Sequence, residues 1–296
     1  MACEVRKPRV TVVGGANMDV AGRPLGTLRL RDSNPGRVSV RPGGVGRNIA
    51  HDLCLLGLSV SLISAVGDDF FGEGLKQSCR ALGMDTSLLL TLPDGRTSTY
   101  LYVSGEDGDM HVGIADMDIT AALTPAYLAS CLGKLNRSDA VVLDANLSAE
   151  TIDYLAEHCL VPLYADPVST AKAPRLKNAL PKLRALKPNA LEAETLTGER
   201  EPAAAARALL DMGAQRVFVS LGAEGILAAE GDAMLKLPCL PGEIVNTNGA
   251  GDAAMAAIVW AGVHGLDLGE AAAAALKAGA LTAACGETNP PALNLK

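Results

Sequence analysis

Short apolar runs rich in β-branched residues alternate with amphipathic helical segments along most of the chain. This alternation predicts an α/β fold with a mainly parallel central sheet flanked by helices, because parallel strands need helical crossovers between them. The expected strands cover residues 9–13, 59–65, 140–144, 162–166 and 216–221. The expected helices cover residues 45–56, 73–82, 148–158, 190–197, 202–212 and 253–262.

Two insertions interrupt this rhythm. Residues 20–40 are turn-rich with short alternating segments, and residues 97–103 and 110–115 read as a hairpin around a Gly-Glu-Asp-Gly turn. We expect the insertions, about residues 16–41 and 96–116, to form a small β-sheet lid. Neither a repeat nor a Pro/Ser-rich linker divides the chain, so one domain over residues 1–296 is expected.

Charge and hydropathy exclude several classes of protein. The 26 basic and 33 acidic residues give a net charge of -7, with no basic stripe for a nucleic-acid backbone. Apolar stretches end well before the roughly 18 residues of a membrane span, and no secretory signal is recognisable. The seven cysteines are scattered without a C-x-x-C motif, so we expect a protein of the reducing cytoplasm. Together with the charge and the short apolar stretches, this predicts a protein that binds neither membrane nor nucleic acid.

The strongest local motif is Asn246-Thr247-Asn248-Gly249-Ala250-Gly251-Asp252, which leads directly into a predicted helix. Small residues allow close backbone approach, and the N–H groups of a helix start attract phosphate. A carboxylate at this place suits a base that takes a proton from an attacking hydroxyl during phosphoryl transfer. The alternative is a glycine turn in which Asp252 caps the helix, and the motif alone leaves both open.

Two other glycine-rich segments precede or follow predicted elements. Pro42-Gly43-Gly44-Val45-Gly46-Arg47-Asn48 starts a helix, and Asn48 offers both a donor and an acceptor to a hydroxyl pair. Asn17 and Asp19 follow the first strand on an extended segment, so both point to one side and could bind vicinal hydroxyls. A polar turn is the alternative. A dinucleotide site is disfavoured because G-x-G-x-x-G is absent.

Residues near the last strands suggest a nucleotide and metal site. Asn189 and Glu192 lie one turn apart at a helix start, where they could hold hydrated Mg²⁺ or form a capping box. The segment from Ser220 to Gly225 follows a strand as a tight turn.

Taken in this order, the motifs resemble those of the ribokinase/PfkB family of carbohydrate and nucleoside kinases over nearly the whole chain. Gly43-Gly44 with Asn48 resembles the amino-terminal signature, Asn189 with Glu192 the N-x-x-E motif, and Gly249 to Asp252 the G-A-G-D of the carboxy-terminal signature. The resemblance implies a ribokinase-like fold, ATP as donor, Mg²⁺ as metal, and phosphorylation of a sugar or nucleoside hydroxyl.

The resemblance also implies roles for individual residues. Asp252 is the expected catalytic base, and the amides of Gly249, Ala250 and Gly251 form the expected anion hole. On the substrate side the expected residues are Asn17, Asp19, Gly43, Gly44, Asn48, Thr97, Thr99, Asp166 and Lys172, although Lys172 could equally be a solvated helix charge. The expected ATP-binding residues are Asn189, Ser220, Gly222, Gly225 and Asn248, and Glu192 is expected to hold Mg²⁺ through water.

A narrower likeness is to the pseudouridine-kinase branch of the family. It includes residues 32–36, 43–50, 96–100, 107–110, 116–117 and 166–169. It implies pseudouridine as acceptor, with lid residues Ser33, Asn34, Thr97 and Thr99 reading the base. The alternatives are a ribokinase, fructokinase or adenosine-type kinase, and a catalytically silent sugar- or nucleotide-binding protein.

Two further expectations concern ions and assembly. The family signature usually begins Asp-Thr, whereas Asn246-Thr247 stands here, which weakens the case for activation by a monovalent cation. A lid edge such as residues 97–103 could pair with a second copy in a homodimer or be covered within one chain.

Overall fold

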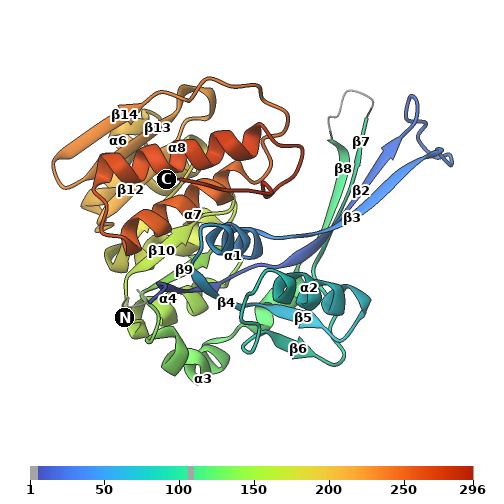
Figure 1. Cartoon of the computed structure of the whole chain (residues 1–296), viewed down its shortest axis with the longest axis horizontal. Helices are drawn as coiled ribbons and strands as arrows, with labels where there is room; N and C mark the ends of the chain where they lie inside the picture. Colours follow the sequence, from blue (N-terminus) through green and yellow to red (C-terminus); the bar gives the residue numbers. More distant parts are fainter. Residues whose placement is uncertain (1–5, 106–109, 296) are drawn as a thin grey trace, which may run out of the picture.

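The computed structural model describes residues 6–105 and 110–295, and a central sheet of eight strands runs through it (Figure 1). Its order is β14-β13-β12-β11-β10-β9-β1-β4. The strands are β1 (Arg9–Val13), β4 (Ser59–Ile63), β9 (Ala140–Asp144), β10 (Leu163–Asp166), β11 (Leu183–Leu186), β12 (Arg216–Ser220), β13 (Ile226–Glu230) and β14 (Ala233–Leu237). Strands β4 to β12 pair in parallel, and β13 and β14 add an antiparallel edge. The predicted α/β architecture is confirmed.

Helices cover both faces of this sheet. One face packs against α3 (Pro125–Leu135), α4 (Ala149–His158), α5 (Ala190–Thr197), α6 (Pro202–Asp211) and the 3-10 helix η2 (Ala173–Lys182). The other packs against α1 (Val45–Leu55), α2 (Phe70–Ala81), α7 (Ala250–Val263) and α8 (Leu268–Ala283). Two short 3-10 helices, η1 (Asp118–Ala122) and η3 (Gly222–Glu224), lie in connections.

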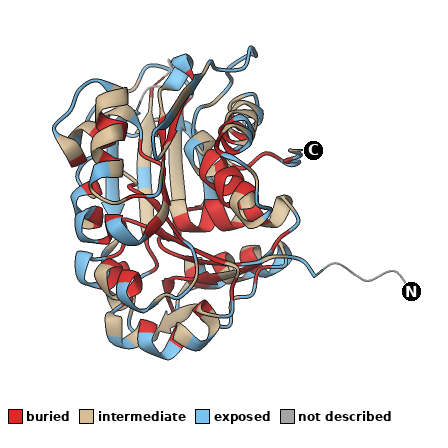
Figure 2. Cartoon of the chain, turned by 90° about the vertical axis from the view of Figure 1, so that its left-hand side faces the viewer, coloured by how far each residue is buried: buried red, intermediate tan, exposed pale blue. Residues whose placement is uncertain are grey.

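The strands bury both faces, as their apolar composition requires. Val142 faces the layer that contains α1 and α7, whereas its neighbours Val141 and Leu143 face the layer that contains α4. Figure 2 shows the buried residues concentrated along the strands and on the inner sides of the helices. Among the described residues, none of the helices combines the length and the apolar character needed to cross a bilayer.

The two insertions build a second sheet, which we call the lid. Its order is β3-β2-β7-β8, formed by β2 (Asn17–Pro24), β3 (Gly36–Gly43), β7 (Thr99–Ser104) and β8 (Met110–Asp116). In Figure 1 these four strands project beyond the helical layers on the right. The predicted small sheet is therefore confirmed. The edge expected over residues 97–103 is covered within the chain, because β7 pairs with β2 on one side and with β8 on the other. Residues 106–109, which include most of the predicted hairpin turn, lie outside the described part of the chain.

Some expected boundaries were wrong, for identifiable reasons. The strand expected over residues 59–65 is divided at Ser64, because β4 pairs with β1 while β5 (Ala65–Gly67) pairs with β6 (Leu90–Leu92) in a separate two-stranded sheet. The helix expected over residues 253–262 begins three residues earlier at Ala250. Helix α8 was missed because its alanine-rich sequence carries little amphipathic signal.

The topology places one end of the sheet under the lid. Strand β1 lies between β4 and β9. The chain therefore adds β4 on one side of β1 and the strands from β9 onward on the other side. In open α/β sheets, ligands bind at the carboxyl ends of the strands beside such a reversal. Asn17, Asp144, Asp166, Lys187 and Ser220 all stand at or just beyond those carboxyl ends.

Candidate active site

The turn after β1 is held against β9 at the reversal point. The amide of Gly15 donates to the carboxylate of Asp144 at 2.9 Å, and the amide of Arg47 donates to the carbonyl of Gly15 at 3.1 Å. A Cβ at Gly14 or Gly15 would collide with the side chain of Asp144 or Asn146. These contacts fix the entry to both β2 and α1.

The expected sugar-binding residues come together between β2, β3 and α1. Asn17 and Asp19 point to the same side, as predicted, and Asn17 Nδ2 donates to Asp19 Oδ1 at 2.6 Å. Asn17 pairs with Gly43 in the lid, where a Cβ would collide with the Asp19 carboxylate. Gly44 has φ 96°, and a Cβ there would lie 2.7 Å from the Gly15 carbonyl oxygen. Burial raises the pKa of Asp19, against the opposing effects of Asn17 and Arg47.

The start of α7, residues 249–251, carries the backbone amides that were expected to bind an anion, and we call it the anion cradle; anion binding there stays a prediction. Gly249 occupies the N-cap position in the left-handed conformation with φ 82°, and its Cα packs against the carbonyl of Thr288 too closely for any side chain. The amides of Gly249, Ala250 and Gly251 belong to the turn in which helical N–H groups lack intrahelical acceptors. The Ala250 amide makes a long hydrogen bond of 3.3 Å to the Thr247 carbonyl.

The structure rules out the interpretation of Asp252 as the cap of the helix, and its role as a catalytic base stays a prediction. Gly249 is the cap, and Asp252 lies half-buried within the first turn of α7. Asn48 Nδ2 donates to Asp252 Oδ2 at 2.9 Å, a contact between residues 204 positions apart. Asn48 was expected to bind the sugar, but sequence spacing gave no signal that it also holds Asp252.

Sequence reasoning missed Lys187, which is buried beside Asp252. Its Nζ lies 3.1 Å from Asp166 Oδ2 and 3.5 Å from the place of a Cβ on Gly251. Burial lowers the pKa of Lys187, but the charges of Asp166, Glu192 and Asp252 outweigh burial and raise it overall. A lysine directly after a buried strand was the available signal. The ammonium therefore faces both the carboxylates and the anion cradle.

These surroundings strongly raise the pKa of the Asp252 carboxyl. Burial and the repulsion of Asp166 raise the pKa of Asp252 to about 8, although the hydrogen bond from Asn48 and the charge of Lys187 lower it. A carboxylate whose pKa lies near the working pH can both accept and release a proton. Asp252 is thus suited to general-base chemistry.

Asn189 and Glu192 do form the capping box that was one of the two interpretations. Asn189 Oδ1 accepts from the Glu192 amide at 2.9 Å, and Glu192 Oε2 accepts from the Asn189 amide at 2.8 Å. The same Glu192 carboxylate interacts electrostatically with Lys187 and Asp166. In the described residues, no three acidic, His or Cys side chains are placed to hold a metal directly. One carboxylate acting through water fits Mg²⁺, which keeps several waters and takes substrate phosphates as ligands.

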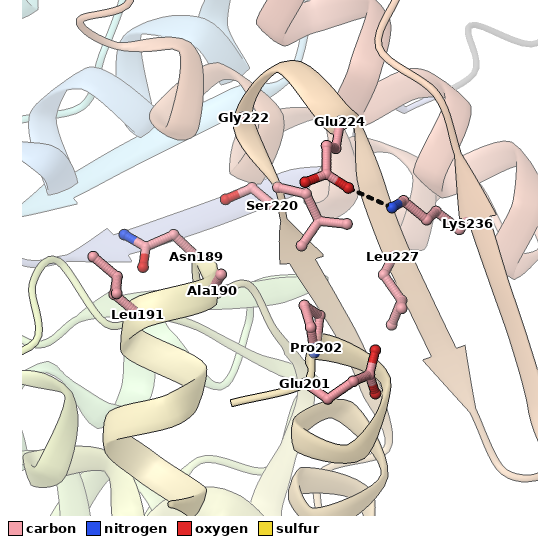
Figure 3. Close-up of a pocket in the computed structure, with 11 residues that line it drawn as sticks. Asn189, Ala190, Leu191, Glu201, Pro202, Ser220, Gly222, Glu224, Leu227 and Lys236 are labelled. Atoms are coloured by element: carbon pink, nitrogen blue, oxygen red, sulfur yellow. Dashed lines mark hydrogen bonds and ion pairs between the residues drawn. The ribbon is translucent and has the colours of Figure 1, made fainter. Parts of the chain in front are cut away.

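A pocket of about 450 Å³ opens beside the capping box (Figure 3). Asn189, Ser220 and Gly222 line it, together with the ion pair between Glu224 and Lys236 at 2.7 Å. Gly222 has φ 59° and open space where a side chain would stand, so a ligand could approach its backbone. Three of the expected ATP-binding residues thus line one pocket, and nucleotide binding there stays a prediction. Glu192, hydrogen-bonded to the Asn189 amide, lies between this pocket and the charges of Asp166 and Lys187.

Three other expected site residues have partners of their own. Gly225 is required because a Cβ would collide with the Leu237 carbonyl of β14, which is a packing reason. The Asn248 amide donates to Asn246 Oδ1 at 3.0 Å, and this turn leads into Gly249. Lys172 Nζ donates to Asn146 Oδ1 at 2.6 Å, so it is held by the side chain that packs over Gly15.

The expected base-reading residues of the lid are largely engaged elsewhere. The Thr97 hydroxyl donates to Asp69 at 2.7 Å and accepts from the Gly67 amide at 3.0 Å, and Thr99 donates to the Thr97 carbonyl. Asn34 closes its own loop through Arg29 and Asp32, and the amide of Ser33 donates to Asp32. Their roles in base recognition stay predictions.

The strand register identifies other lid residues beside Asp19. Asp19 pairs with Arg41 of β3 and with Tyr100 of β7, so all three share one face of the lid. Tyr102 lies two residues further on this face, with its ring centroid 5.6 Å from that of Tyr100. A sequence pattern could have identified Arg41 and Tyr100 only if the pairing of the two insertions had been known.

Comparison with known proteins identifies the family of the chain. Residues 7–294 match the family described as pfkB family carbohydrate kinase. The pseudouridine kinase of Escherichia coli K12 is 37% identical over 98% of this chain and 95% of that protein. The uncharacterized sugar kinase YeiI of the same organism is 35% identical over 96% and 80%. The structure of Arabidopsis thaliana ribokinase with ribose and ATP has the same fold, with a TM-score of 0.85, 20% identity and coverage of 96% of both chains.

The raised pKa of Asp252 predicts a pH-dependent loss of stability. From about pH 4 to about pH 8 the folded protein holds a proton on Asp252 that the unfolded chain releases, so stability falls as pH rises. Asp252→Asn removes this titration. Equilibrium unfolding in urea should show the variant gaining stability relative to the wild type as the pH rises from about 4 to about 8. The exposed Asp211→Asn is the control, and a pH-independent difference for Asp252→Asn would contradict the prediction.

Proposed function

Because the chain belongs to the pfkB family of carbohydrate kinases, we propose that it transfers the γ-phosphoryl group of ATP to the 5′-hydroxyl of a nucleoside, with pseudouridine preferred. The family establishes a phosphotransferase with an alcohol group as acceptor, and its members use ATP. The single observation that carries the mechanism is the position of Asp252. It lies at the anion cradle of α7 and is hydrogen-bonded to Asn48 of the sugar side.

The residues support an in-line transfer. Asp252 accepts the proton of the acceptor hydroxyl as the new O–P bond forms and the bond from phosphorus to the ADP oxygen breaks. The amides of Gly249 and Gly251, with Lys187 beside them, stabilise the charge on the transferred group. When bound through water to Glu192, Mg²⁺ would neutralise charge on the phosphate oxygens. Lid closure would exclude water that competes with the acceptor.

The polar face of the lid favours a base-bearing acceptor. Asn17 and Asp19 offer acceptors and donors to ribose hydroxyls, which both a free sugar and a nucleoside possess. Tyr100 lies on the same lid face as Asp19 and adds an aromatic surface on which a base can stack. Arg41, opposite Asp19, supplies donors suited to the carbonyl oxygens of a uracil ring. A ribokinase-type acceptor is the second candidate, because the hydroxyl-binding residues suit free ribose equally.

Replacing the base tests the mechanism. Asp252→Asn keeps the hydrogen bond from Asn48 but cannot accept the proton, so kcat should fall about 10² to 10⁴-fold while KM changes little. Steady-state kinetics with Mg-ATP measure this. The exposed Asp211→Asn provides the matched control. Turnover near the wild-type rate in Asp252→Asn would remove Asp252 from the mechanism.

Acceptor identity is tested by comparing pseudouridine, uridine, adenosine, ribose and fructose. Pseudouridine and uridine share the ribose, so their difference in kcat/KM measures recognition of the base. We expect pseudouridine to have the highest kcat/KM, and Tyr100→Leu to reduce nucleoside kcat/KM by about tenfold, the size of one stacking contact, with little effect on ribose. Comparable efficiency on ribose, or a preference for adenosine, would reject pseudouridine and leave the kinase assignment intact.

A homodimer through the lid and a cytoplasmic location also belong to the proposal. The lid face opposite Asp19 carries a continuous set of aliphatic side chains, and several are strongly exposed, including Val38, Val112 and Ile114. A self-complementary apolar face of this kind suits a second copy related by a two-fold axis.

The dimer is tested by placing a charge on each face of the lid. Ile114→Asp should sediment as a 30.4 kDa monomer, because the buried apolar contact would then carry a carboxylate. Ser39→Asp, on the Asp19 face, should leave the dimer intact. A wild-type protein that stays monomeric at high concentration would refute the assembly.

A further inference from the structure

A network of buried polar side chains lies behind Asp252, and among its members only Asn48 has a part in the mechanism above. Arg47, Asn48, Asp52 and Asn289 are each less than a tenth exposed. Arg47 Nη1 donates to Asn289 Oδ1 at 2.9 Å and to Asn48 Oδ1 at 3.3 Å. Asn289 Nδ2 donates to Asp52 Oδ1 at 2.9 Å. This network therefore links Asn289 of the C-terminal segment to Asn48, which donates to Asp252.

The direction of these hydrogen bonds fixes the amide of Asn48. A guanidinium has only donors, so the amide oxygen of Asn48 must face Arg47 and the amide nitrogen must face Asp252. In the reversed orientation the Asn48 oxygen would face the carboxyl of Asp252. That arrangement repels the ionised base and accepts a hydrogen bond from the protonated one. Arg47 thus favours the form of Asp252 that can accept a proton.

Asn289 orients Arg47 in the same way. Its amide oxygen accepts from Arg47, while its nitrogen donates to Asp52 and to the Asn48 carbonyl at 3.3 Å. The preceding residue, Thr288, places its carbonyl against Gly249 of the anion cradle. One short C-terminal segment therefore contacts both the cradle and the support of the base.

We propose that Arg47 is a positioning residue, held by Asn289, that sets the amide of Asn48 so that it donates to Asp252. The proposal rests on the proposed role of Asp252 as the base. It adds a residue that touches neither substrate nor the reacting atoms and acts through Asn48.

The test compares Arg47→Met and Asn289→Ala with Ser78→Ala. The Ser78 hydroxyl accepts from Arg47 Nη2 at 3.2 Å. Its removal therefore takes away a contact of Arg47 that does not involve Asn48, Asp52 or Asn289. For Arg47→Met and Asn289→Ala, kcat should fall about 10 to 100-fold, the size of the loss when the hydrogen-bond partners of metal ligands are removed. The acid limb of the kcat-pH profile should move up by as much as about one pH unit, the size of a charge-assisted hydrogen bond. Ser78→Ala should retain the wild-type kcat and profile.

A second pair of variants keeps the test usable if Arg47→Met alone does not fold. Arg47→Met leaves Asp52 without its neighbouring cation, so Arg47→Met/Asp52→Asn is compared with Asp52→Asn alone. Asp52→Asn alone is the reference because the charge of Asp52, like those of Asp166 and Lys187, acts on the pKa of Asp252. The shift of the acid limb should persist in the double variant relative to Asp52→Asn.

Two outcomes overturn the proposal while leaving the mechanism in place. One is an unmoved acid limb with kcat within twofold of the reference in folded Arg47 variants. The other is a rise in KM alone, which would assign Arg47 to ground-state binding. If Asp252→Asn itself retains turnover, the proposed base is wrong, and this result is distinct from either of the others.

Discussion

The candidate active site depends on one buried cation. Lys187 stands just after β11, with Asp166 at 3.1 Å and the carboxylates of Glu192 and Asp252 close enough to act on it. Without this ammonium, three carboxyl groups at the carboxyl edge of the sheet would repel one another in a poorly solvated place. Asp166 therefore keeps a cationic partner, while burial and the charge of Asp166 raise the pKa of Asp252 although Lys187 lowers it. The same ammonium lies 3.5 Å from the place of a Cβ on Gly251 in the first turn of α7, where the proposed mechanism places the phosphate.

Backbone proximity makes this arrangement possible. Gly43, Gly44 and Gly249 stand where a Cβ would collide with Asp19, with the turn after β1, or with Thr288. The glycines let the lid, α1 and α7 approach within hydrogen-bonding distance of one another. As a result Asn48 of α1 reaches Asp252 of α7, so the proposed sugar-binding and phosphate-binding segments meet at one carboxylate.

The lid shows how a strand period of two divides functions between faces. Asp19, Arg41 and Tyr100 share the face on which an acceptor would lie, and the opposite face carries Val38 and Ile114 among its aliphatic residues. A shift of one residue in register would exchange these faces. The pairing of β2 with both β3 and β7 therefore places Asp19, Arg41 and Tyr100, the side chains proposed to contact the acceptor, on one face.

The sequence by itself determined the α/β class, the small second sheet and the helix starts at Val45 and Ala190. It also determined that Asn17 and Asp19 point to the same side. Each follows from a local period or from a spacing of a few residues, which one segment contains in full. It also contained both interpretations of Asp252 and of Asn189 with Glu192, because a cap and a ligand site use the same residue types.

Only the tertiary structure decided the rest. It made Gly249 the cap of α7, joined Asn48 to Asp252, buried Lys187 against Asp166, and placed Arg41 and Tyr100 opposite Asp19. It also engaged Thr97 with Asp69 rather than leaving its hydroxyl free. These contacts join residues far apart in the chain, and their energies depend on burial and on neighbouring charge. Such quantities exist only once the strands have brought the segments together.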